Sequence, residues 1–388
     1  MKNILLLNSI SPVVNDIFNS EYSLSTDCAS PVGIMLRSFK MHDYELDENT
    51  IAIARAGAGT NNIPVEKYAS EGVVVFNTPG ANANAVKELV LSALFLASRN
   101  VIEANRWVDT LKGKGEEVGK LVEKGKANFV GNEILGKKLG VVGLGAIGAQ
   151  VANSAISLGM EVYGYDPFLS VNAALKLSRA VNVVKTLDEL VSTCDYLTIH
   201  IPYIPAQNKG LFNSEMFAKM KDGVVIINCA RGEIVDNVSV LTAIKSGKIK
   251  KYVCDFPADE LIGEENVLCI PHLGASTNEA EDNCAVMAAN QLIEYIENGN
   301  IVNSVNYPSC SMPRTTEIRL VILHKNIANI IAQITTAVGK ENINIMNMAN
   351  QSKGEFAVTI LDVEKEVSSE SIKHLLAVDG IIKIRVVK

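Results

Sequence analysis

Three glycines, Gly143, Gly145 and Gly148, form a GxGxxG pattern directly after the apolar run 139–142. In such a turn the first glycine permits the tight bend, the second lets the backbone approach a pyrophosphate, and the third lets a helix pack closely on the strand. The free N–H groups at the start of that helix then face the phosphates. Asp166 ends the next predicted strand, at about the twenty-residue spacing of an acid that binds ribose hydroxyls and repels a 2′-phosphate. The pattern therefore predicts a site for NAD rather than NADP.

Three further polar residues, Arg231, Glu260 and His272, each come shortly after a predicted strand. Ligands bind at the carboxyl ends of parallel strands, so these side chains are candidates for a reaction centre. A guanidinium can hold a carboxylate by two hydrogen bonds, and a histidine beside a carboxylate can exchange a proton near neutral pH. Taken singly, each also has a structural interpretation: Arg231 as a surface ion pair, Glu260 as a solvated acid, and His272 as a capping residue.

The elements that must position these residues follow from the hydrophobic pattern. Short apolar runs of strand length alternate with longer helical patterns through most of the chain, which is typical of a parallel sheet covered on both faces. The runs lie at residues 4–7, 33–36, 51–54, 73–76, 139–142, 161–165, 196–199 and 224–227. Residues 83–98 predict one amphipathic helix, and residues 111–126 predict a loop or a short exposed helix.

A different pattern occupies the end of the chain. Residues 303–316 contain Pro308 and Pro313 among several serines, a composition that suits an exposed linker. Strand and helix patterns then follow at residues 317–323, 327–339, 343–348, 355–362, 369–377 and 381–387. Their order, β-α-β-β-α-β, predicts a ferredoxin-like α+β unit.

Composition argues against several classes of protein. The chain has 388 residues, of which 48% are hydrophobic and 20% charged, so we expect two or three folded domains. A net charge of -7 argues against nucleic acid as a partner. No apolar stretch has the length of a membrane span, and the first residues predict a β-strand rather than a signal peptide. Seven scattered cysteines, without CxxC or zinc-like spacing, favour a reduced, cytoplasmic protein with no metal site.

Several segments together resemble, in order and spacing, the NAD-dependent D-2-hydroxyacid dehydrogenases over about residues 1–305. Besides the glycine turn, these segments are residues 228–232, 255–260 and 271–277, and residues 55–63 and 77–84 are most similar to the phosphoglycerate dehydrogenase branch. The C-terminal unit resembles an ACT domain, a serine-sensing module. The resemblance implies an α/β fold: two doubly wound, Rossmann-like parallel-sheet domains with a cleft, followed by the ferredoxin-like ACT domain.

The resemblance also implies domain boundaries. A discontinuous substrate-binding domain would comprise residues 1–98 and 288–304, with an NAD-binding Rossmann domain at residues 99–287. Residues 305–316 would form the linker and residues 317–388 the ACT-like regulatory domain. Exposed strand edges in that last domain favour pairing between subunits, so we expect a homodimer or a homotetramer.

The family's catalytic arginine, glutamate and histidine fall on Arg231, Glu260 and His272. The resemblance implies that His272 accepts the C2 hydroxyl proton while the hydride moves to the nicotinamide, that Glu260 stabilises the imidazolium, and that Arg231 orients the carboxylate. The residues implied in NAD binding are Gly143, Gly145, Ala146, Ile147, Gly148, Asp166, His200, Pro202, Cys229, Ala230, Arg231, Asp255, His272, Gly274 and Ala275. Those implied in substrate binding are Arg55, for a phosphate, and Ala56, Gly57, Ala58 and Gly59, for the carboxylate.

The implied reaction is oxidation of 3-phospho-D-glycerate, a phosphorylated 2-hydroxy acid, to 3-phosphohydroxypyruvate, the first step of the phosphorylated route to L-serine. Two alternatives stay open: another D-2-hydroxyacid dehydrogenase, such as a hydroxypyruvate or glyoxylate reductase, and a non-catalytic NAD-sensing scaffold. Substrate phosphate dependence would separate the two enzymes.

L-Serine is a candidate effector. His324, Asn326 and Asn344 match the positions that hold the amino acid in serine-binding ACT domains. The chain departs from that pattern before the next helix, where Ala328 and Asn329 replace the usual Pro-Gly. The other interpretation makes His324 a turn residue that caps the helix and Asn344 an amide of a loop or edge strand.

Overall fold

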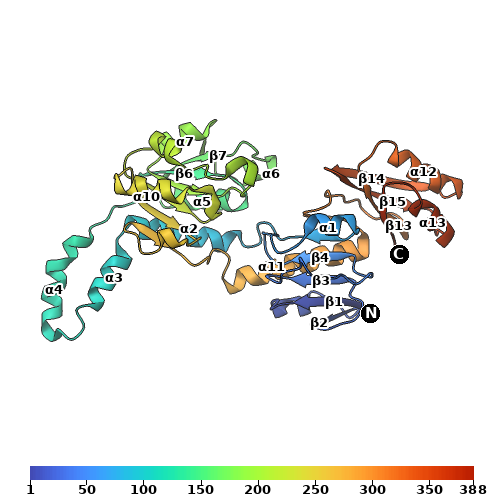
Figure 1. Cartoon of the computed structure of the whole chain (residues 1–388), viewed down its shortest axis with the longest axis horizontal. Helices are drawn as coiled ribbons and strands as arrows, with labels where there is room; N and C mark the ends of the chain where they lie inside the picture. Colours follow the sequence, from blue (N-terminus) through green and yellow to red (C-terminus); the bar gives the residue numbers. More distant parts are fainter. The chain divides into compact units, whose positions relative to one another are not determined.

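The computed structural model describes residues 1–388, except for the side chain of Asn172, and the chain divides into two compact units. The first unit comprises Met1–Asn82 and Asn278–Lys388, and the second comprises Ala83–Thr277. Figure 1 labels their helices and strands along the sequence. The C-terminal residues thus group with the first sheet of the chain.

Two helices explain why this division differs from the boundaries expected at residues 98 and 288. The predicted helix α2 (Ala83–Ser98) forms, but it buries Val90 and Leu94 in the core of the second unit. Helix α11 (Asn278–Asn298) buries Ala285 and Leu292 in the core of the first unit. Each helix is therefore assigned by the sheet against which its apolar face packs.

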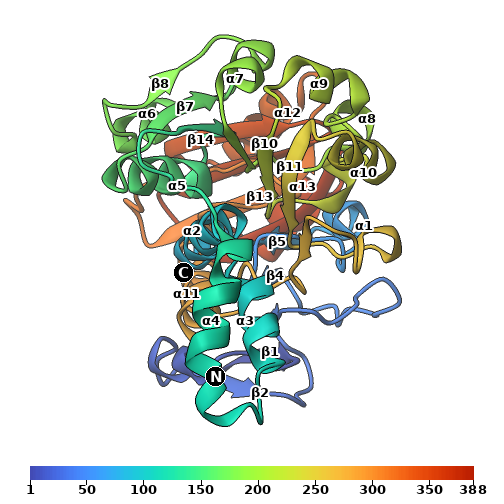
Figure 2. The ribbon, with the colours of Figure 1, turned by 90° about the vertical axis from the view of Figure 1, so that its left-hand side faces the viewer.

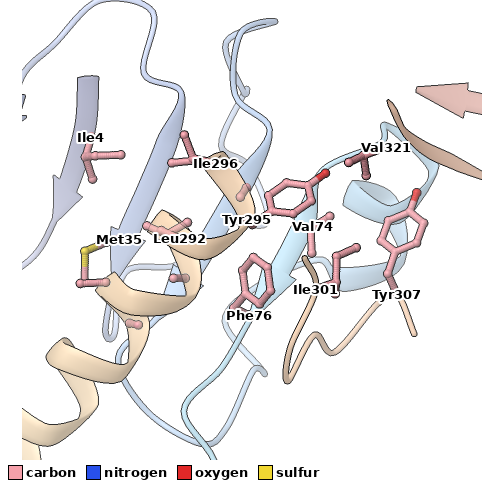
Figure 3. Close-up of a cluster of buried hydrophobic side chains, with 14 of the residues drawn as sticks. Ile4, Met35, Val74, Phe76, Leu292, Tyr295, Ile296, Ile301, Tyr307 and Val321 are labelled. Carbon is pink, nitrogen blue, oxygen red and sulfur yellow. The ribbon is translucent and has the colours of Figure 1, made fainter. Parts of the chain in front are cut away.

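The first unit begins with a five-stranded parallel sheet in the order β2-β1-β3-β4-β5. Its strands are β1 (Lys2–Leu7), β2 (Tyr22–Ser25), β3 (Gly33–Leu36), β4 (Ala52–Arg55) and β5 (Val74–Phe76). Side chains alternate between two cores: Met35 faces α11, whereas Ile34 and Leu36 face the side of α1 (Val65–Ser70). Figure 3 shows the first of these cores, with Phe76 beside Tyr295 of α11.

The second unit holds a seven-stranded parallel sheet in the order β12-β11-β10-β9-β6-β7-β8. Its strands are β6 (Lys138–Val142), β7 (Glu161–Tyr165), β8 (Asn182–Val183), β9 (Tyr196–Ile199), β10 (Val224–Asn228), β11 (Ile249–Cys254) and β12 (Val267–Cys269). Helices α2 and α5 (Ala146–Ser157) cover one face of the sheet. Helices α7 (Leu187–Thr193), α9 (Ser214–Lys219) and α10 (Asn237–Lys245) cover the other face. Strand order reverses between β6 and β9, which creates the crevice where ligands bind in such sheets.

Two helices extend from the second unit as an arm. Helices α3 (Val101–Asp109) and α4 (Val118–Gly125) run side by side (Figures 1 and 2), and the Trp107 ring lies 5.3 Å from that of Phe129. The short exposed helix predicted within residues 111–126 therefore forms as α4. The remaining helices of this unit are α6 (Val171–Lys176) and α8 (Pro205–Asn208). Across the described residues, none of the helices combines the length and hydropathy that a bilayer crossing requires.

The C-terminal residues form a four-stranded antiparallel sheet in the order β14-β15-β13-β16. Its elements are β13 (Ile318–Lys325), α12 (Ile330–Lys340), β14 (Ile345–Lys353), β15 (Phe356–Val363), α13 (Ser369–Leu376) and β16 (Ile381–Val387). Helices α12 and α13 pack on one face of this sheet. The other face contributes Val321 and Val358 to the core that contains α11. The ferredoxin-like arrangement and the predicted α/β class, with two Rossmann-like parallel sheets, are confirmed.

The expectation of an exposed linker at residues 303–316 is wrong for residues 304–308, which are buried or half-buried, whereas Ser311, Pro313 and Thr315 are exposed. Tyr307 is fully buried, and its hydroxyl donates to the Ala69 carbonyl at 2.6 Å. The Asn306 side chain pairs with the edge of β5, because its amide donates to the Val73 carbonyl at 2.9 Å and accepts from the Val75 N–H at 2.9 Å. Asn306 thus copies the hydrogen bonds of an additional strand, which the proline and serine content of the segment did not reveal.

Three arginines of the C-terminal part complete the last turn of α11. The final carbonyls of a helix have no partners within it, and they attract positive charge. Arg385 donates to two of these carbonyls, each at 3.0 Å. Arg314 donates to the third at 3.3 Å and Arg319 to the fourth at 2.9 Å. In chain order the four carbonyls belong to Tyr295, Ile296, Glu297 and Asn298.

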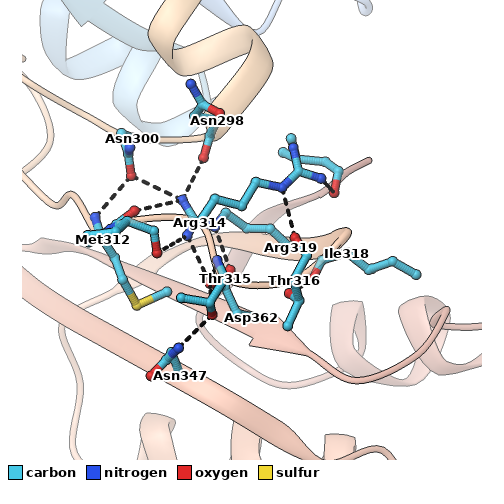
Figure 4. Close-up of polar contacts among 12 residues, drawn as sticks. Asn298, Asn300, Met312, Arg314, Thr315, Thr316, Ile318, Arg319, Asn347 and Asp362 are labelled. Atoms are coloured by element: carbon cyan, nitrogen blue, oxygen red, sulfur yellow. Dashed lines mark hydrogen bonds and ion pairs between the residues drawn. The ribbon is translucent and has the colours of Figure 1, made fainter.

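Arg319 is fully buried and forms a two-pronged ion pair with Asp362, at 2.6 Å from Nε and 3.0 Å from Nη2 (Figure 4). Burial alone would raise the pKa of Asp362, but the hydrogen bonds from Arg319 and Thr315 hold that pKa below its usual value. Asp362 therefore stays ionised and the pair persists near neutral pH. Arg319 also donates to the Met312 and Pro313 carbonyls, at 3.0 and 3.1 Å.

We predict that Arg319→Ala lowers the free energy of unfolding by about 3–5 kcal/mol, because it leaves the buried Asp362 carboxylate without its counter-charge. Urea unfolding followed by fluorescence measures the loss. Lys325→Ala, at the exposed end of the same strand, is the matched control and should change the free energy by less than about 0.5 kcal/mol. Equal and small losses in both variants would show that the pair contributes little.

Candidate active site

The glycine turn joins β6 to α5, and each glycine has a separate reason to be there. Gly143 has a φ of +90°, and a Cβ on it would lie 2.7 Å from the His200 carbonyl oxygen. A Cβ on Gly148 would collide with the Gly143 carbonyl oxygen. Gly145 has open space where its Cβ would be. The turn is therefore tight at its ends and accessible at its middle, as a backbone cradle for a pyrophosphate must be.

Asp166 follows β7 and lies against the same turn. Its Oδ2 accepts the Leu144 N–H at 2.9 Å, and its Oδ1 accepts the Phe168 N–H at 2.9 Å. The carboxylate is thus fixed beside the cradle, where it can accept hydrogen bonds from ribose hydroxyls. These residues fit a dinucleotide.

His200 follows β9, the neighbour of β6 across the point where strand order reverses. Its N–H donates to the Val142 carbonyl at 2.7 Å, and its ring Nε2 lies 2.9 Å from the Thr198 hydroxyl. Burial lowers the pKa of His200 to about 3, so the ring is neutral. Among the described residues, its buried Nδ1 has no hydrogen-bond partner. The next turn is held by Asn208, which donates to the Pro202 carbonyl at 2.7 Å.

Arg231 lies in the turn after β10, together with Cys229 and Ala230. The fully buried Asn228 shapes that turn, because its side chain accepts the Ala230 N–H at 3.1 Å and donates to the Arg231 carbonyl at 2.9 Å. The Arg231 guanidinium donates from Nη1 to the Ala230 carbonyl at 2.6 Å. Sequence reasoning did not single out Asn228, although an asparagine that turns its own following backbone is a known local pattern.

His272 adopts a left-handed backbone with a φ of +54°, a conformation that costs a non-glycine residue about 1–2 kcal/mol. Asp255, which is 2% exposed, holds the following backbone: its two oxygens accept the Leu273 and Gly274 N–H groups at 2.7 and 2.8 Å. We expected Asp255 among the NAD contacts, and here both of its oxygens already serve the His272 loop. Strained backbone held by its neighbours is characteristic of functional sites.

Glu260 is exposed and accepts a hydrogen bond from the Asn237 side chain at 2.9 Å. This bond, and one from its own backbone N–H, lower the pKa of Glu260. The ring nearest to His272 is that of Phe256, at 4.7 Å between centroids. The pairing of Glu260 with His272, which the sequence suggested, stays a prediction.

In the first unit, Arg55 ends β4, and its guanidinium lies against the Cα of Gly57. Its Nε donates to the Arg37 carbonyl at 2.9 Å. Asn77 supports the same turn by donating to the Ala58 carbonyl at 2.6 Å. A cation and a backbone turn therefore adjoin at the carboxyl end of this strand, and the binding of an anionic substrate by residues 55–59 stays a prediction.

The three candidate serine-binding residues do not gather within one chain. His324 is buried, with Nε2 2.9 Å from the Thr359 hydroxyl, and burial lowers its pKa. The Asn326 N–H donates to the Glu355 carbonyl before β15, whereas the Asn344 carbonyl accepts from the Glu364 N–H beyond the end of β15. His324 and Asn326 therefore share one end of the sheet, and Asn344 lies at the other. Asn329, in place of the usual glycine, takes the left-handed conformation itself, with a φ of +66°.

The described residues contain no group of three or more histidine, cysteine, aspartate or glutamate side chains able to hold a metal ion.

Comparisons with known proteins agree with this geometry. Residues 91–274 match the family model described as "D-isomer specific 2-hydroxyacid dehydrogenase, NAD binding domain". The chain is 34% identical over 348 residues to D-3-phosphoglycerate dehydrogenase of Haemophilus influenzae, covering 87% of this chain and 81% of that one. It is 31% identical over 368 residues to the enzyme of the same name from Escherichia coli, covering 91% and 86%.

Solved structures show the same fold. NAD+-bound 3-phosphoglycerate dehydrogenase of Entamoeba histolytica superposes with a TM-score of 0.61 and 25% identity, over 79% of this chain and 98% of that one. Apo D-mandelate dehydrogenase of Rhodotorula graminis superposes with a TM-score of 0.65 and 22% identity, over 78% and 97%. From the curated relatives and the matching cofactor domain, the chain belongs to the D-isomer specific 2-hydroxyacid dehydrogenases and is an NAD-dependent oxidoreductase.

Proposed function

We propose that this enzyme oxidises 3-phospho-D-glycerate to 3-phosphohydroxypyruvate with NAD, the first step of the phosphorylated route to L-serine. The observation that carries the proposal is Arg55, whose guanidinium lies against the turn at the carboxyl end of β4. A guanidinium can bind a phosphate through paired hydrogen bonds, and the neighbouring backbone of residues 56–59 can receive a carboxylate. The names of the curated relatives support the same substrate.

The units divide the work in this proposal. The parallel sheet of the first unit presents Arg55 to the substrate, and the second unit holds NAD at the turn from Gly143 to Gly148, with Asp166 at the ribose. When bound, NAD supplies the hydride acceptor. His200 and Pro202 would lie beside the adenosine, and the segments with Cys229, Ala230, Gly274 and Ala275 would lie beside the nicotinamide.

The reaction at C2 is assigned to three side chains. Arg231 grips the carboxylate and orients the carbonyl that develops at C2. His272 takes the proton of the hydroxyl group on C2 while the hydride leaves C2. Glu260 stabilises the resulting imidazolium, and its own lowered pKa keeps it ionised near neutral pH. The rate enhancement comes from holding these charged groups in position before the substrate binds.

Residues 317–388, the ferredoxin-like part of the first unit, are proposed to be an ACT-like regulatory domain with L-serine as its effector. Since Asn344 lies at the opposite end of β15 from His324 and Asn326, a serine site that uses all three residues needs a second chain. A homodimer or homotetramer supplies one, and the outer backbone of edge strand β14 is open to pairing. The free thiols of the seven cysteines support a reducing, cytoplasmic location.

The first prediction of this proposal concerns the substrate phosphate. NADH formation should be fast with 3-phospho-D-glycerate and slow with D-glycerate. Arg55→Met should raise the KM for the phosphorylated substrate by about 10–100-fold, which corresponds to the free energy of a hydrogen bond to a charged group. Lys40→Met, the matched control, should leave that KM nearly unchanged. Preference for unphosphorylated substrates would place the enzyme with the hydroxypyruvate and glyoxylate reductases. NAD binding without turnover would favour the sensing scaffold.

The second prediction concerns Glu260. In this proposal its negative charge, which its lowered pKa preserves near neutral pH, stabilises the imidazolium that forms when His272 accepts the proton. Glu260→Gln removes that charge, so kcat for oxidation should fall by about ten-fold or more while the KM for NAD changes little. Asp259→Asn removes an equal charge one residue away and should leave kcat nearly unchanged. An unchanged kcat in Glu260→Gln would remove this residue from the proton transfer.

The third prediction concerns the effector. Calorimetric titration of the full chain with L-serine should release or absorb heat, and L-serine should change the rate. The variant Asn344→Ala should abolish both effects while leaving the rate without serine unchanged. No heat and an unchanged rate in the wild-type enzyme would contradict the regulatory role.

A further inference from the structure

We infer that Phe256 is a positioning residue that holds the side chains of His272 and Arg231 beside one another. This inference deepens the proposed function and rests on the roles assigned there to His272 and Arg231. Three observations carry it: what the ring touches, what leaves His272 free to turn, and what fixes the ring itself.

The Phe256 ring contacts both reactive side chains. It meets the His272 ring almost perpendicularly, at 84° and 4.7 Å between centroids, which is a favourable edge-to-face arrangement. The Arg231 guanidinium carbon lies 6.0 Å from the centre of the same ring, at the limit of a cation–π contact. A single aromatic side chain therefore adjoins the proton acceptor and the carboxylate clamp.

His272 needs such a contact because its other anchors act only on the backbone. Its own N–H donates to the Ile270 carbonyl at 2.9 Å, and Asp255 holds the next two N–H groups. These bonds fix where the Cα lies, but they leave the exposed imidazole free to rotate about its side-chain bonds. The Phe256 ring restricts that rotation without competing for the proton, since it carries no hydrogen-bonding group.

Phe256 is itself well held. It follows Asp255, whose carboxylate is buried under the His272 loop, and it precedes Pro257. A Cβ on Gly232 would lie 3.2 Å from the Phe256 Cβ, so the glycine after Arg231 makes room for this residue. The Phe256 carbonyl lies 3.8 Å from the Cys254 thiol, which donates to it. The ring thus sits on backbone that is fixed on both sides.

The test compares variants that remove the ring with variants that keep it. Phe256→Leu keeps the residue apolar but loses both ring contacts, and kcat should fall by about ten-fold, the combined worth of one aromatic and one cation–π contact. The KM for NAD should stay within about two-fold, because the glycine turn is untouched. Phe256→Tyr keeps the ring and should restore kcat to within about three-fold of wild type.

A double variant separates positioning from simple loss of structure. If Phe256 acts through both side chains, Phe256→Leu should lower the residual rate of the His272→Ala enzyme by less than about five-fold, because only the Arg231 contact remains to be lost. A full ten-fold loss in that background would overturn the inference, as would an unchanged kcat in Phe256→Leu or a failure of Phe256→Tyr to restore it. Phe217→Leu, at the buried position of α9, is the control for a general loss of packing.

The same assays keep this inference distinct from the proposed function. Each variant is measured with whichever 2-hydroxy acid the wild-type enzyme oxidises best. If the wild-type enzyme prefers a substrate other than 3-phospho-D-glycerate, the proposed reaction is overturned, but the comparison of the Phe256 variants still holds. Normal phosphoglycerate oxidation with an unaffected Phe256→Leu enzyme would overturn only the positioning role.

Discussion

Parallel pairing of strands is the constraint on which the candidate site depends. When neighbouring strands run in the same direction, the residues that follow them emerge at one edge of the sheet. In the second unit this brings the turn after β6, Asp166 after β7, His200 after β9 and Arg231 after β10 to the same edge. Asp255 and His272 follow β11 and β12 at that edge as well. Antiparallel pairing would send half of these groups to the opposite side.

Within that edge, buried polar groups convert flexible loops into fixed ones. Asn228 ties the Arg231 turn to its strand, and Asp255 ties the His272 loop to its neighbour. Both side chains are buried, so a lost partner would leave an unsatisfied polar group and its full desolvation cost. The half-buried Arg231 and the exposed His272 therefore keep a fixed backbone, because the buried Asn228 and Asp255 hold their loops.

The sequence carried much of this arrangement, for a local reason. A glycine turn, a strand and the polar residue after the strand are all specified by neighbours a few positions away, so the cradle and the alternation of parallel strands with helices could be predicted. The ferredoxin-like unit could be predicted for the same reason. The order of the strands within each sheet was not predicted. Contacts between residues distant in sequence could not be predicted, because they depend on how segments of the chain meet in three dimensions. Examples are Asn237 with Glu260, Phe256 with His272, and Asn306 with the edge of β5. Composition misled at residues 303–316, because proline and serine say nothing about the strand edge that receives Asn306.

The arginine cap of α11 bears on how the chain could be cut or recombined. A ferredoxin-like unit at the end of an enzyme resembles a detachable module, yet here Arg314, Arg319 and Arg385 supply the donors for four carbonyls of a helix that belongs to the first sheet. Truncation before β13 would remove Arg319 and Arg385, so the carbonyls of Tyr295, Ile296 and Asn298 would lose these donors and the apolar surface around Tyr307 would face water. Grafting β13–β16 onto another dehydrogenase would in turn remove the helix carbonyls that Arg319 and Arg385 cap here, although Arg319 would keep its ion pair with Asp362. The boundary that is simplest to draw along the sequence is thus a poor place to divide the molecule.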